Sequence, residues 1–352
     1  MDPLDAFDYK LPPELIANTP ANPRDHARLF VYDTATDRIH VDTVRHLDKY
    51  IPSHSLLVMN DTKVVPARLW LEKETGGKIE VLLSINEFRK GDTLIKGIVD
   101  RKLSVGAKLS FRSGATLLVV RQEEQFFFFR PSVTFPQLWK LLDREGHTPI
   151  PPYIKNTPLS EKRLRDRYQT IFAQHGASVA APTASLHFTN RVFNALDRKE
   201  VSRAFVTLNV GAGTFAPIDR TNFEAKSLFT EYCGIGKQEA NTINRAKNDG
   251  AKIIPVGTTA MRTLESFATL YNGNWCVEPG EKGTNIFIFD PYQFKIADGL
   301  LTNFHVPRSS LLLLVDALLR SKSAKRSIIE LYEIAIRERF RFYSFGDAML
   351  IL

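Results

Sequence analysis

The pattern of residues 69–148 predicts a series of short β-strands, which limits what this part of the chain can fold into. Apolar runs recur there at roughly ten-residue spacing, separated by glycine turns, as is typical of a small β-barrel or β-sandwich. The last run is four consecutive phenylalanines followed by Arg130 and Pro131, and we expect it to be a strand of the barrel core. The predicted strands are residues 78–83, 92–95, 108–111, 115–120 and 126–129.

The chain changes to an α/β pattern after Pro151. We predict a helix over residues 239–248 with Gly250 at its carboxyl end, then a short buried strand over residues 252–256. A Gly-Thr-Thr turn follows, and we expect it to open a second helix at Ala260. This strand, turn and helix order is an α/β unit, in which ligands bind at the carboxyl ends of the strands.

The composition is that of an ordinary globular protein, since 43% of the 352 residues are hydrophobic and 24% are charged. The formal net charge of +8 favours an anionic partner. Because the chain has only two cysteines, Cys233 and Cys276, we expect neither a disulfide framework nor a cysteine-rich zinc site. The first residues are acidic, and the apolar run at residues 311–315 is too short to span a bilayer, so we expect a soluble, cytoplasmic protein.

Four runs of small residues place hydroxyl, amide or imidazole groups beside apolar segments, and we expect them to form one composite site. These runs are residues 178–188 (SVAAPTASLHF), 207–215 (TLNVGAGTF), 256–262 (VGTTAMR) and 302–307 (TNFHVP). The third run predicts a helix N-terminus that attracts a carboxylate or phosphate, with simple capping by its threonines as the alternative. His187 and His305 fit either a packed, hydrogen-bonded role or a catalytic one. Neither has neighbours at zinc-ligand spacing, so we expect no metal.

The same runs occur with four further strings that lie along almost the whole chain. These strings are residues 7–17 (FDYKLPPELIA), 60–68 (NDTKVVPAR), 151–154 (PPYI) and 341–349 (RFYSFGDAM). The ordered set closely resembles the S-adenosylmethionine:tRNA ribosyltransferase-isomerase family of queuosine biosynthesis. Chance can supply one such string, but not the whole series in this order.

The resemblance implies an α/β large domain, residues 1–68 plus 150–352, with an inserted small β-barrel domain over residues 69–149. It also implies transfer and isomerisation of the ribosyl group of S-adenosylmethionine onto 7-aminomethyl-7-deazaguanine at the tRNA wobble position. Epoxyqueuosine-tRNA would form, with release of adenine and methionine. The implied partners are the modified tRNA and S-adenosylmethionine, the ribosyl-donor substrate, with no further cofactor and no membrane. We expect a monomer.

We assign candidate roles to residues in and beside these strings. The candidate proton-transfer or ribose-orienting groups are Asp61, His187, Glu231 and His305. The candidates for holding S-adenosylmethionine are Thr183, Asn209, Gly211, Gly213, Thr214, Thr258, Thr259 and Arg262. A positive stretch that is either a solvated face or a phosphate-binding surface contains Lys155, Lys162, Arg163, Arg165 and Arg167. Two tyrosines are candidates for stacking on a base, Tyr168 and Tyr343. Arg68 and Asp347 fit structural ion pairing instead.

Three places differ from the family's usual pattern. Asn209 stands where the family usually has a histidine, Leu228-Phe229 replaces a Met-His pair, and Asp290-Pro291 replaces a Pro-Gly turn. Losing a group that titrates near neutral pH argues against acid–base chemistry at position 209. Two alternatives therefore stay open: a diverged paralogue that binds S-adenosylmethionine or tRNA without the transfer, and an enzyme of similar fold that acts on another nucleoside.

Overall fold

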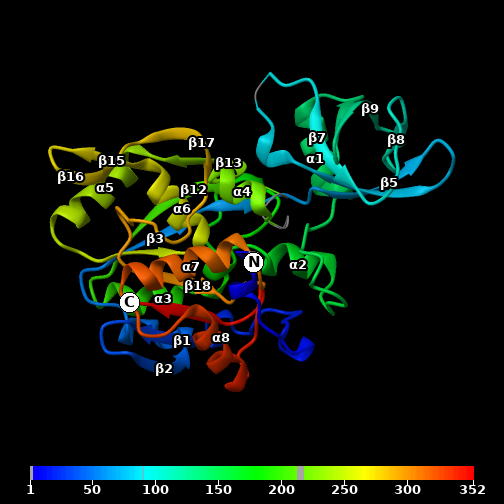
Figure 1. Ribbon diagram of the computed structural model, residues 1–352. Coiled ribbons are helices and arrows are strands. Elements are labelled where there is room, and N and C mark those ends of the chain that lie inside the picture. Colours follow the sequence, from blue (N-terminus) through cyan, green and yellow to red (C-terminus); the bar gives the residue numbers. More distant parts are fainter. Residues whose placement is uncertain (1–2, 90, 212–217) are drawn as a thin grey trace.

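The structure is a computed structural model that describes residues 3–89, 91–211 and 218–352. Figure 1 shows a large α/β part and, beside it, a small β-barrel. The predicted fold class, an α/β large domain with a small inserted β-barrel, is therefore confirmed. Among the described residues, no helix combines the length and the apolar character needed to cross a membrane.

A nine-stranded sheet forms the centre of the large part. Its strands are, in spatial order, β17 (Gly280–Ile286), β13 (Ser227–Ile235), β12 (Ser202–Asn209), β3 (Leu56–Asn60), β14 (Ile253–Val256), β18 (Leu300–Asn303), β19 (Ala348–Ile351), β1 (Arg28–Asp33) and β2 (Arg38–Thr43). Four neighbours, β12, β3, β14 and β18, run parallel to one another, so their carboxyl ends share one edge of the sheet. That edge is where an α/β sheet offers a ligand site.

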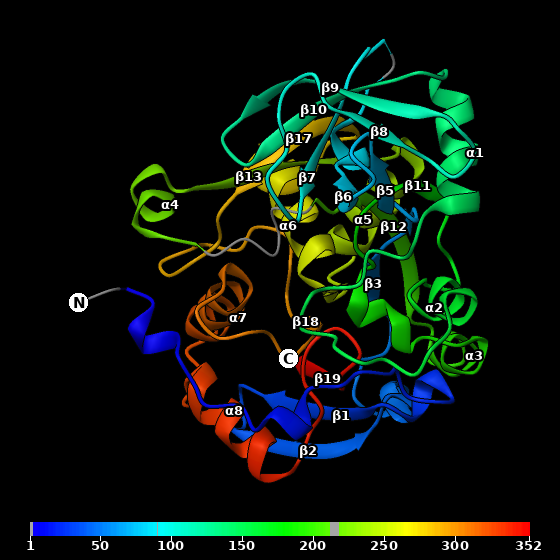
Figure 2. The same cartoon turned by 90° about the vertical axis from the view of Figure 1, so that its right-hand side faces the viewer.

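Strand β14 and the first four residues of β3 are continuously apolar because both faces of the sheet are covered there. Leu56 and Val58 of β3 pack with residues of α5 (Lys237–Asn248) and α6 (Thr258–Phe267), whereas Leu57 packs on the opposite face with α3 (Asn190–Asp197). In Figure 2, α7 (Ser310–Ser321) and α8 (Ile328–Arg337) lie to the left of the sheet and α3 lies to its right. The remaining α-helices of this part are α2 (Glu161–Arg167) and α4 (Arg220–Ala225).

Short elements complete the large part. The paired strands are β4 (Thr62–Val64) with β11 (His175–Ser178), and β15 (Ala268–Tyr271) with β16 (Asn274–Val277). The 3-10 helices of this part are η1 (Asp5–Phe7), η2 (Pro13–Leu15), η3 (Arg24–His26), η4 (Val44–Lys49) and η6 (Thr183–His187), whereas η5 (Ile85–Glu87) belongs to the barrel segment.

Both predicted helices exist, and each begins two residues earlier than expected, α5 at Lys237 and α6 at Thr258. Helix α5 ends at Asn248, and Gly250 adopts φ +76° just beyond it, as a glycine after a helix often does. Helix α6 begins at Thr258, not at Ala260. Gly257 makes the turn with φ +91°, so both threonines fall in the first helical turn.

The barrel closes in the order β10-β7-β6-β5-β8-β9. Its strands are β5 (Arg68–Lys73), β6 (Lys78–Leu83), β7 (Ile95–Val99), β8 (Lys108–Ser110), β9 (Thr116–Glu123) and β10 (Phe126–Pro131). Phe127 and Phe129 fill its core together with leucines of the following helix α1 (Phe135–Glu145), which confirms a core strand at the phenylalanine run. The strand predicted at residues 92–95 is wrong except at its last residue, because Asp92 forms a turn with Arg89 through its backbone N–H and its carboxylate.

The chain enters and leaves the barrel at one place. Arg68 and His147 form an isolated antiparallel bridge, with Arg68 N donating to His147 O at 3.2 Å and His147 N donating to Arg68 O at 2.7 Å. Gly146 lies beside this bridge, and a β-carbon there would come within 1.9 Å of the Pro66 carbonyl oxygen. The bridge and this close approach hold the barrel against the large part.

Candidate functional site

A cavity of about 1180 Å³ lies at the carboxyl ends of the parallel strands. All four sequence runs contribute to its wall, through Ala180–Ala184, Val210, Gly257–Thr259 and Thr302–Pro307. We call this space the main cavity. The expectation that the four runs come together is confirmed, because β12, β14 and β18 end side by side at this edge.

The N-terminus of α6 forms one wall of the main cavity. Thr258 and Thr259 line the cavity, and within residues 3–89, 91–211 and 218–352 no side chain caps the helix, so its first N–H groups have no capping partner there. The Thr259 hydroxyl instead accepts a hydrogen bond from Asn60 Nδ2 at 3.1 Å. The capping alternative is therefore wrong, and the exposed helix end suits a negatively charged group of a ligand.

A chain of hydrogen bonds links η6 to the end of β18. Thr183 Oγ1, in the cavity wall, donates to Asn303 Oδ1 at 2.8 Å. Asn303 Nδ2 lies 3.3 Å from His187 Nε2 and donates to the Asp347 carbonyl at 3.2 Å. His187 is buried behind the wall and is not among the lining residues. Burial lowers the pKa of His187 to about 4, so its imidazole is neutral at neutral pH.

His305 is the candidate imidazole that lines the main cavity. Its Nε2 lies 2.8 Å from Thr302 Oγ1, while its backbone is held by Tyr332 and Tyr9. Burial lowers the pKa of His305 to about 3. Such an imidazole is a poor proton acceptor at neutral pH, which favours an orienting role over proton removal.

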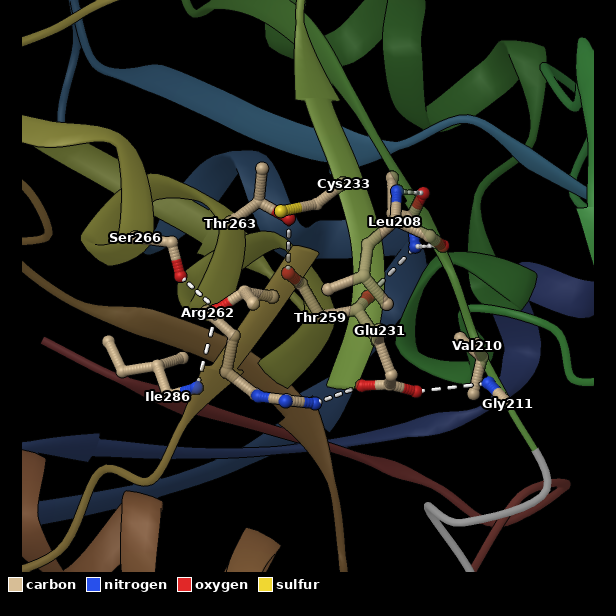
Figure 3. Close-up of polar contacts among 12 residues, drawn as sticks. Leu208, Val210, Gly211, Glu231, Cys233, Thr259, Arg262, Thr263, Ser266 and Ile286 are labelled. Atoms are coloured by element: carbon tan, nitrogen blue, oxygen red, sulfur yellow. Dashed lines mark hydrogen bonds and ion pairs between the residues drawn. The ribbon is translucent and has the colours of Figure 1, made fainter. Parts of the chain in front are cut away.

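Glu231 and Arg262 form a buried ion pair next to the main cavity (Figure 3). One carboxylate oxygen of Glu231 accepts from Arg262 Nη1, and the other accepts from Gly211 N at 3.0 Å. Within the described part of the chain, Arg262 Nε and Nη2 have no hydrogen-bond partner. Arg262 lines neither this cavity nor the one described next, so it does not directly contact the space of either cavity. The candidates Gly213 and Thr214 lie outside the described residues.

A second cavity of about 860 Å³ contains Asp61 and Asn209. Asp61 Oδ1 accepts from Thr207 Oγ1 at 2.7 Å, and burial raises the pKa of Asp61. Asn209 Oδ1 accepts from Thr62 Oγ1 at 2.8 Å. Successive side chains of a strand point to opposite faces, which separates Asn209 from Val210 in the main cavity. We call this space the second cavity.

The predicted basic stretch is only partly free to meet a ligand. Lys155, Lys162 and Arg163 are exposed. Arg165, by contrast, pairs with Glu161 and donates to the carbonyls of Asp143 and Gly146. Arg167 donates to Asn22 Oδ1. The three exposed cations therefore remain candidates for phosphate contact.

The two stacking candidates differ. Tyr168 lines the main cavity, but it is 1% exposed and packs edge-on against Phe345, so stacking of its ring on a base stays a prediction. Tyr343 is half-buried, lines the main cavity and lies 4.9 Å from the ring of Tyr153. Tyr153 was not singled out from the sequence, although it lies in one of the quoted strings. Its hydroxyl is 2.6 Å from Ser344 Oγ, a further lining residue.

The remaining assignments and departures lie away from the main cavity. Arg68 pairs with Glu80, while Asp347 binds Arg341 through side-chain and backbone groups. Phe229 is 48% exposed on β13 and lines neither cavity. Asp290 lies near Arg320 on the surface. Of the departures, only Asn209 lies in either cavity.

Comparison with known proteins agrees with this architecture. The family described as "Queuosine biosynthesis protein" matches residues 4–351. An S-adenosylmethionine:tRNA ribosyltransferase-isomerase from Carboxydothermus hydrogenoformans is 42% identical over 352 residues, covering 98% of each chain. The crystal structure of an S-adenosylmethionine tRNA ribosyltransferase from Thermotoga maritima is 32% identical, with a TM-score of 0.54, and the match covers 98% of this chain and 99% of that one.

Proposed function

Because the chain belongs to the queuosine biosynthesis protein family, we propose that it transfers and isomerises the ribosyl group of S-adenosylmethionine onto tRNA. The acceptor is the aminomethyl group of 7-aminomethyl-7-deazaguanine at the wobble position, and the products are epoxyqueuosine-tRNA, adenine and methionine. The 42% identity to an enzyme with this name, over almost the full length of both chains, supports the assignment. A tRNA substrate also favours a cytoplasmic location.

The observation that carries the proposal is the main cavity at the N-terminus of α6. Its volume of about 1180 Å³ is at the upper end for small-molecule sites, which suits a nucleoside with a long amino-acid arm. We assign the carboxylate of the methionine arm to the uncapped N–H groups beside Thr258 and Thr259. The hydroxyl of Thr183 and the imidazole of His305 line the same space and are placed to orient the ribose.

The substrate supplies much of its own activation. The positive sulfonium acidifies the ribose carbon beside it, so a proton can leave that carbon to a positioned base. The aminomethyl nitrogen then provides the electron pair of the new bond to the ribose, while the glycosidic bond to adenine and the carbon–sulfur bond to methionine break and both groups leave. The role of the protein is to hold the two substrates in line and to keep water out.

Both candidate histidines are neutral at neutral pH, which fits a protein that positions its substrates while the substrate supplies the activation. His187 is separated from the main cavity by Thr183 and Asn303, so we assign it a positioning role. His305 touches the cavity, and with a pKa of about 3 it offers a hydrogen bond rather than a strong base. Glu231 holds Arg262 and Gly211 in place.

For tRNA binding we propose the exposed cations Lys155, Lys162 and Arg163. Lys155 follows Tyr153 of the cavity wall by two residues, so phosphate contacts here would lie near the main cavity. Tyr343, in the same wall, is the proposed stacking residue for an anticodon base next to the wobble position.

The direct test is to incubate the purified protein with S-adenosylmethionine and tRNA that carries the 7-aminomethyl-7-deazaguanine base. We expect adenine and methionine to be released and an epoxyqueuosine nucleoside to be found by mass spectrometry. Binding of both substrates without product would instead support a diverged, non-transferring paralogue, the alternative that the Asn209 departure favours.

A further inference from the structure

The second cavity lies where the barrel segment meets the large sheet. Asp61 and Asn209 come from the ends of β3 and β12, whereas Arg89 follows η5 of the barrel segment. Their chain neighbours Asn60 and Val210 face the other way, since Asn60 bonds to Thr259 of the main cavity and Val210 lines that cavity directly. The two cavities are therefore separated by little more than the ends of two strands.

The polar groups of the second cavity have unused hydrogen-bonding capacity. Asp61 Oδ1 accepts from Thr207, but among the described residues Oδ2 has only His175 Nε2 at 3.5 Å, which is long for a hydrogen bond. Asn209 uses its Oδ1 for Thr62, and within the described residues its Nδ2 donates to no protein group. The cavity thus presents a carboxylate acceptor beside an amide donor.

The cavity also offers flat surfaces of the kind on which bases stack. The guanidinium of Arg89 lies 3.2 Å from the centroid of the Tyr232 ring, and both residues line the cavity. Arg89 Nη1 donates to the carbonyls of Asn86 and Phe88, which fixes the plane of the guanidinium. Aromatic rings and guanidinium planes are the usual supports for an unstacked base.

We propose that the second cavity binds the 7-deazaguanine base through its Watson–Crick edge, with Asp61 accepting from N1–H and the 2-amino group and Asn209 donating to O6. This assignment rests on the proposed function, which supplies such a base. A guanine-type edge offers two neighbouring donors to the carboxylate, whereas adenine offers one donor beside an acceptor. Asp61 therefore selects the acceptor base and rejects the adenine of S-adenosylmethionine, which is left to the main cavity.

The test uses two synthetic anticodon stem-loops that differ at the wobble base. One carries 7-aminomethyl-7-deazaguanine, and the other carries the same base without its 2-amino group. The wild-type protein should bind the first roughly 10- to 100-fold more tightly in a calorimetric titration, because the second loses a hydrogen bond to a charged acceptor. Asp61→Asn should abolish this preference, since the amide has one acceptor in place of two, and should leave the Kd for S-adenosylmethionine unchanged.

Asp316→Asn is the matched control. Asp316 is also a buried aspartate, it pairs with Arg320 in α7, and it lines neither cavity. This variant should retain the full preference for the 2-amino base.

A second variant makes the test independent of how well Asp61→Asn folds. Asn209→Leu removes the proposed donor to O6, so it should weaken binding of both stem-loops by about tenfold and leave the preference between them intact. Equal binding of the two stem-loops by the wild type would overturn the proposal, as would a full preference in Asp61→Asn. Product formation from intact tRNA is measured separately, so a wild type that makes epoxyqueuosine without showing the preference would refute only this assignment.

Discussion

The carboxylate of Glu231, on β13, forms an ion pair with the guanidinium of Arg262, on α6. Both groups are almost completely removed from solvent. The other oxygen of Glu231 holds the backbone N–H of Gly211, so one side chain connects β13, α6 and the end of β12 (Figure 3). Removing one partner of a buried ion pair leaves the other charge uncompensated, which is more costly than the pair itself is stabilising.

Glu231→Gln should therefore lower the free energy of unfolding by on the order of 3 to 5 kcal/mol, measured by urea denaturation. The substitution keeps the size of the side chain and removes only its charge. Glu333→Gln, at an exposed position on α8, should change this free energy by less than about 0.5 kcal/mol. Similar small effects for the two variants would contradict a compensating role of Glu231.

Stability should depend on pH through His187. Because burial lowers its pKa from 6.5 to about 4, the unfolded chain takes up a proton at higher pH than the folded protein. The stabilising contribution is therefore complete above pH 6.5 and is lost as the pH falls from 6.5 towards 4, by on the order of 3 kcal/mol. Urea denaturation at several pH values should show a shallower dependence for His187→Gln than for the wild type. The exposed His26→Gln variant should keep the wild-type dependence.

The salt dependence of tRNA binding should report on the exposed cations of α2. If Lys162 and Arg163 each neutralise a phosphate, replacing both by glutamate should reduce the slope of log Kd for tRNA against log salt concentration by about 2. Binding of S-adenosylmethionine should stay the same. The same charge reversal at Arg245 and Lys247 of α5 is the control, and it should leave the slope unchanged. An unaltered slope in the α2 variant would show that this stretch is an ordinary solvated face and does not contact phosphates.

The two histidine departures should behave differently when they are reversed. Phe229→His should leave kcat and KM unchanged, because Phe229 lines neither cavity. Asn209→His should raise kcat more than it changes KM, since an imidazole N–H can still donate to O6 while its second nitrogen adds a titratable group that acts mainly in the transition state. Steady-state kinetics with modified tRNA distinguish the two. A large effect of Phe229→His would show that this position contributes to catalysis after all.

The residue pattern alone predicted a small β-barrel or β-sandwich, the body of α6 and the gathering of the four polar runs, and the family resemblance decided for the barrel. Glycine turns, apolar periodicity and the position of threonines after a strand are local signals, and local packing does not override them here. The start of α6 was misplaced because the left-handed turn at Gly257 admits Thr258 and Thr259 into the helix.

The division of the candidate residues between two cavities could not be predicted in the same way. It depends on which face of β12 Asn209 occupies, and that depends on the pairing of β12 with β3. Tyr168 illustrates the same limit, because the sequence cannot show that Phe345, far along the chain, packs against its ring and leaves it almost completely buried in the wall of the main cavity. Likewise, only the folded structure shows that Arg165 is occupied by carbonyl groups of the barrel's last helix and the residue that follows it.

Because Arg68 and His147 are bridged, the chain enters and leaves the barrel at neighbouring points, and the barrel could be cut out of the chain as one segment. Paired antiparallel residues lie about 5 Å apart between α-carbons, so the two crossing points of the chain are already close enough to be joined by a tight turn. Excision of the intervening residues would leave the central sheet without a broken strand, and the released segment could be closed on itself into a ring. Such an excision would remove Arg89 from the wall of the second cavity, and with it one of the surfaces on which we place the base.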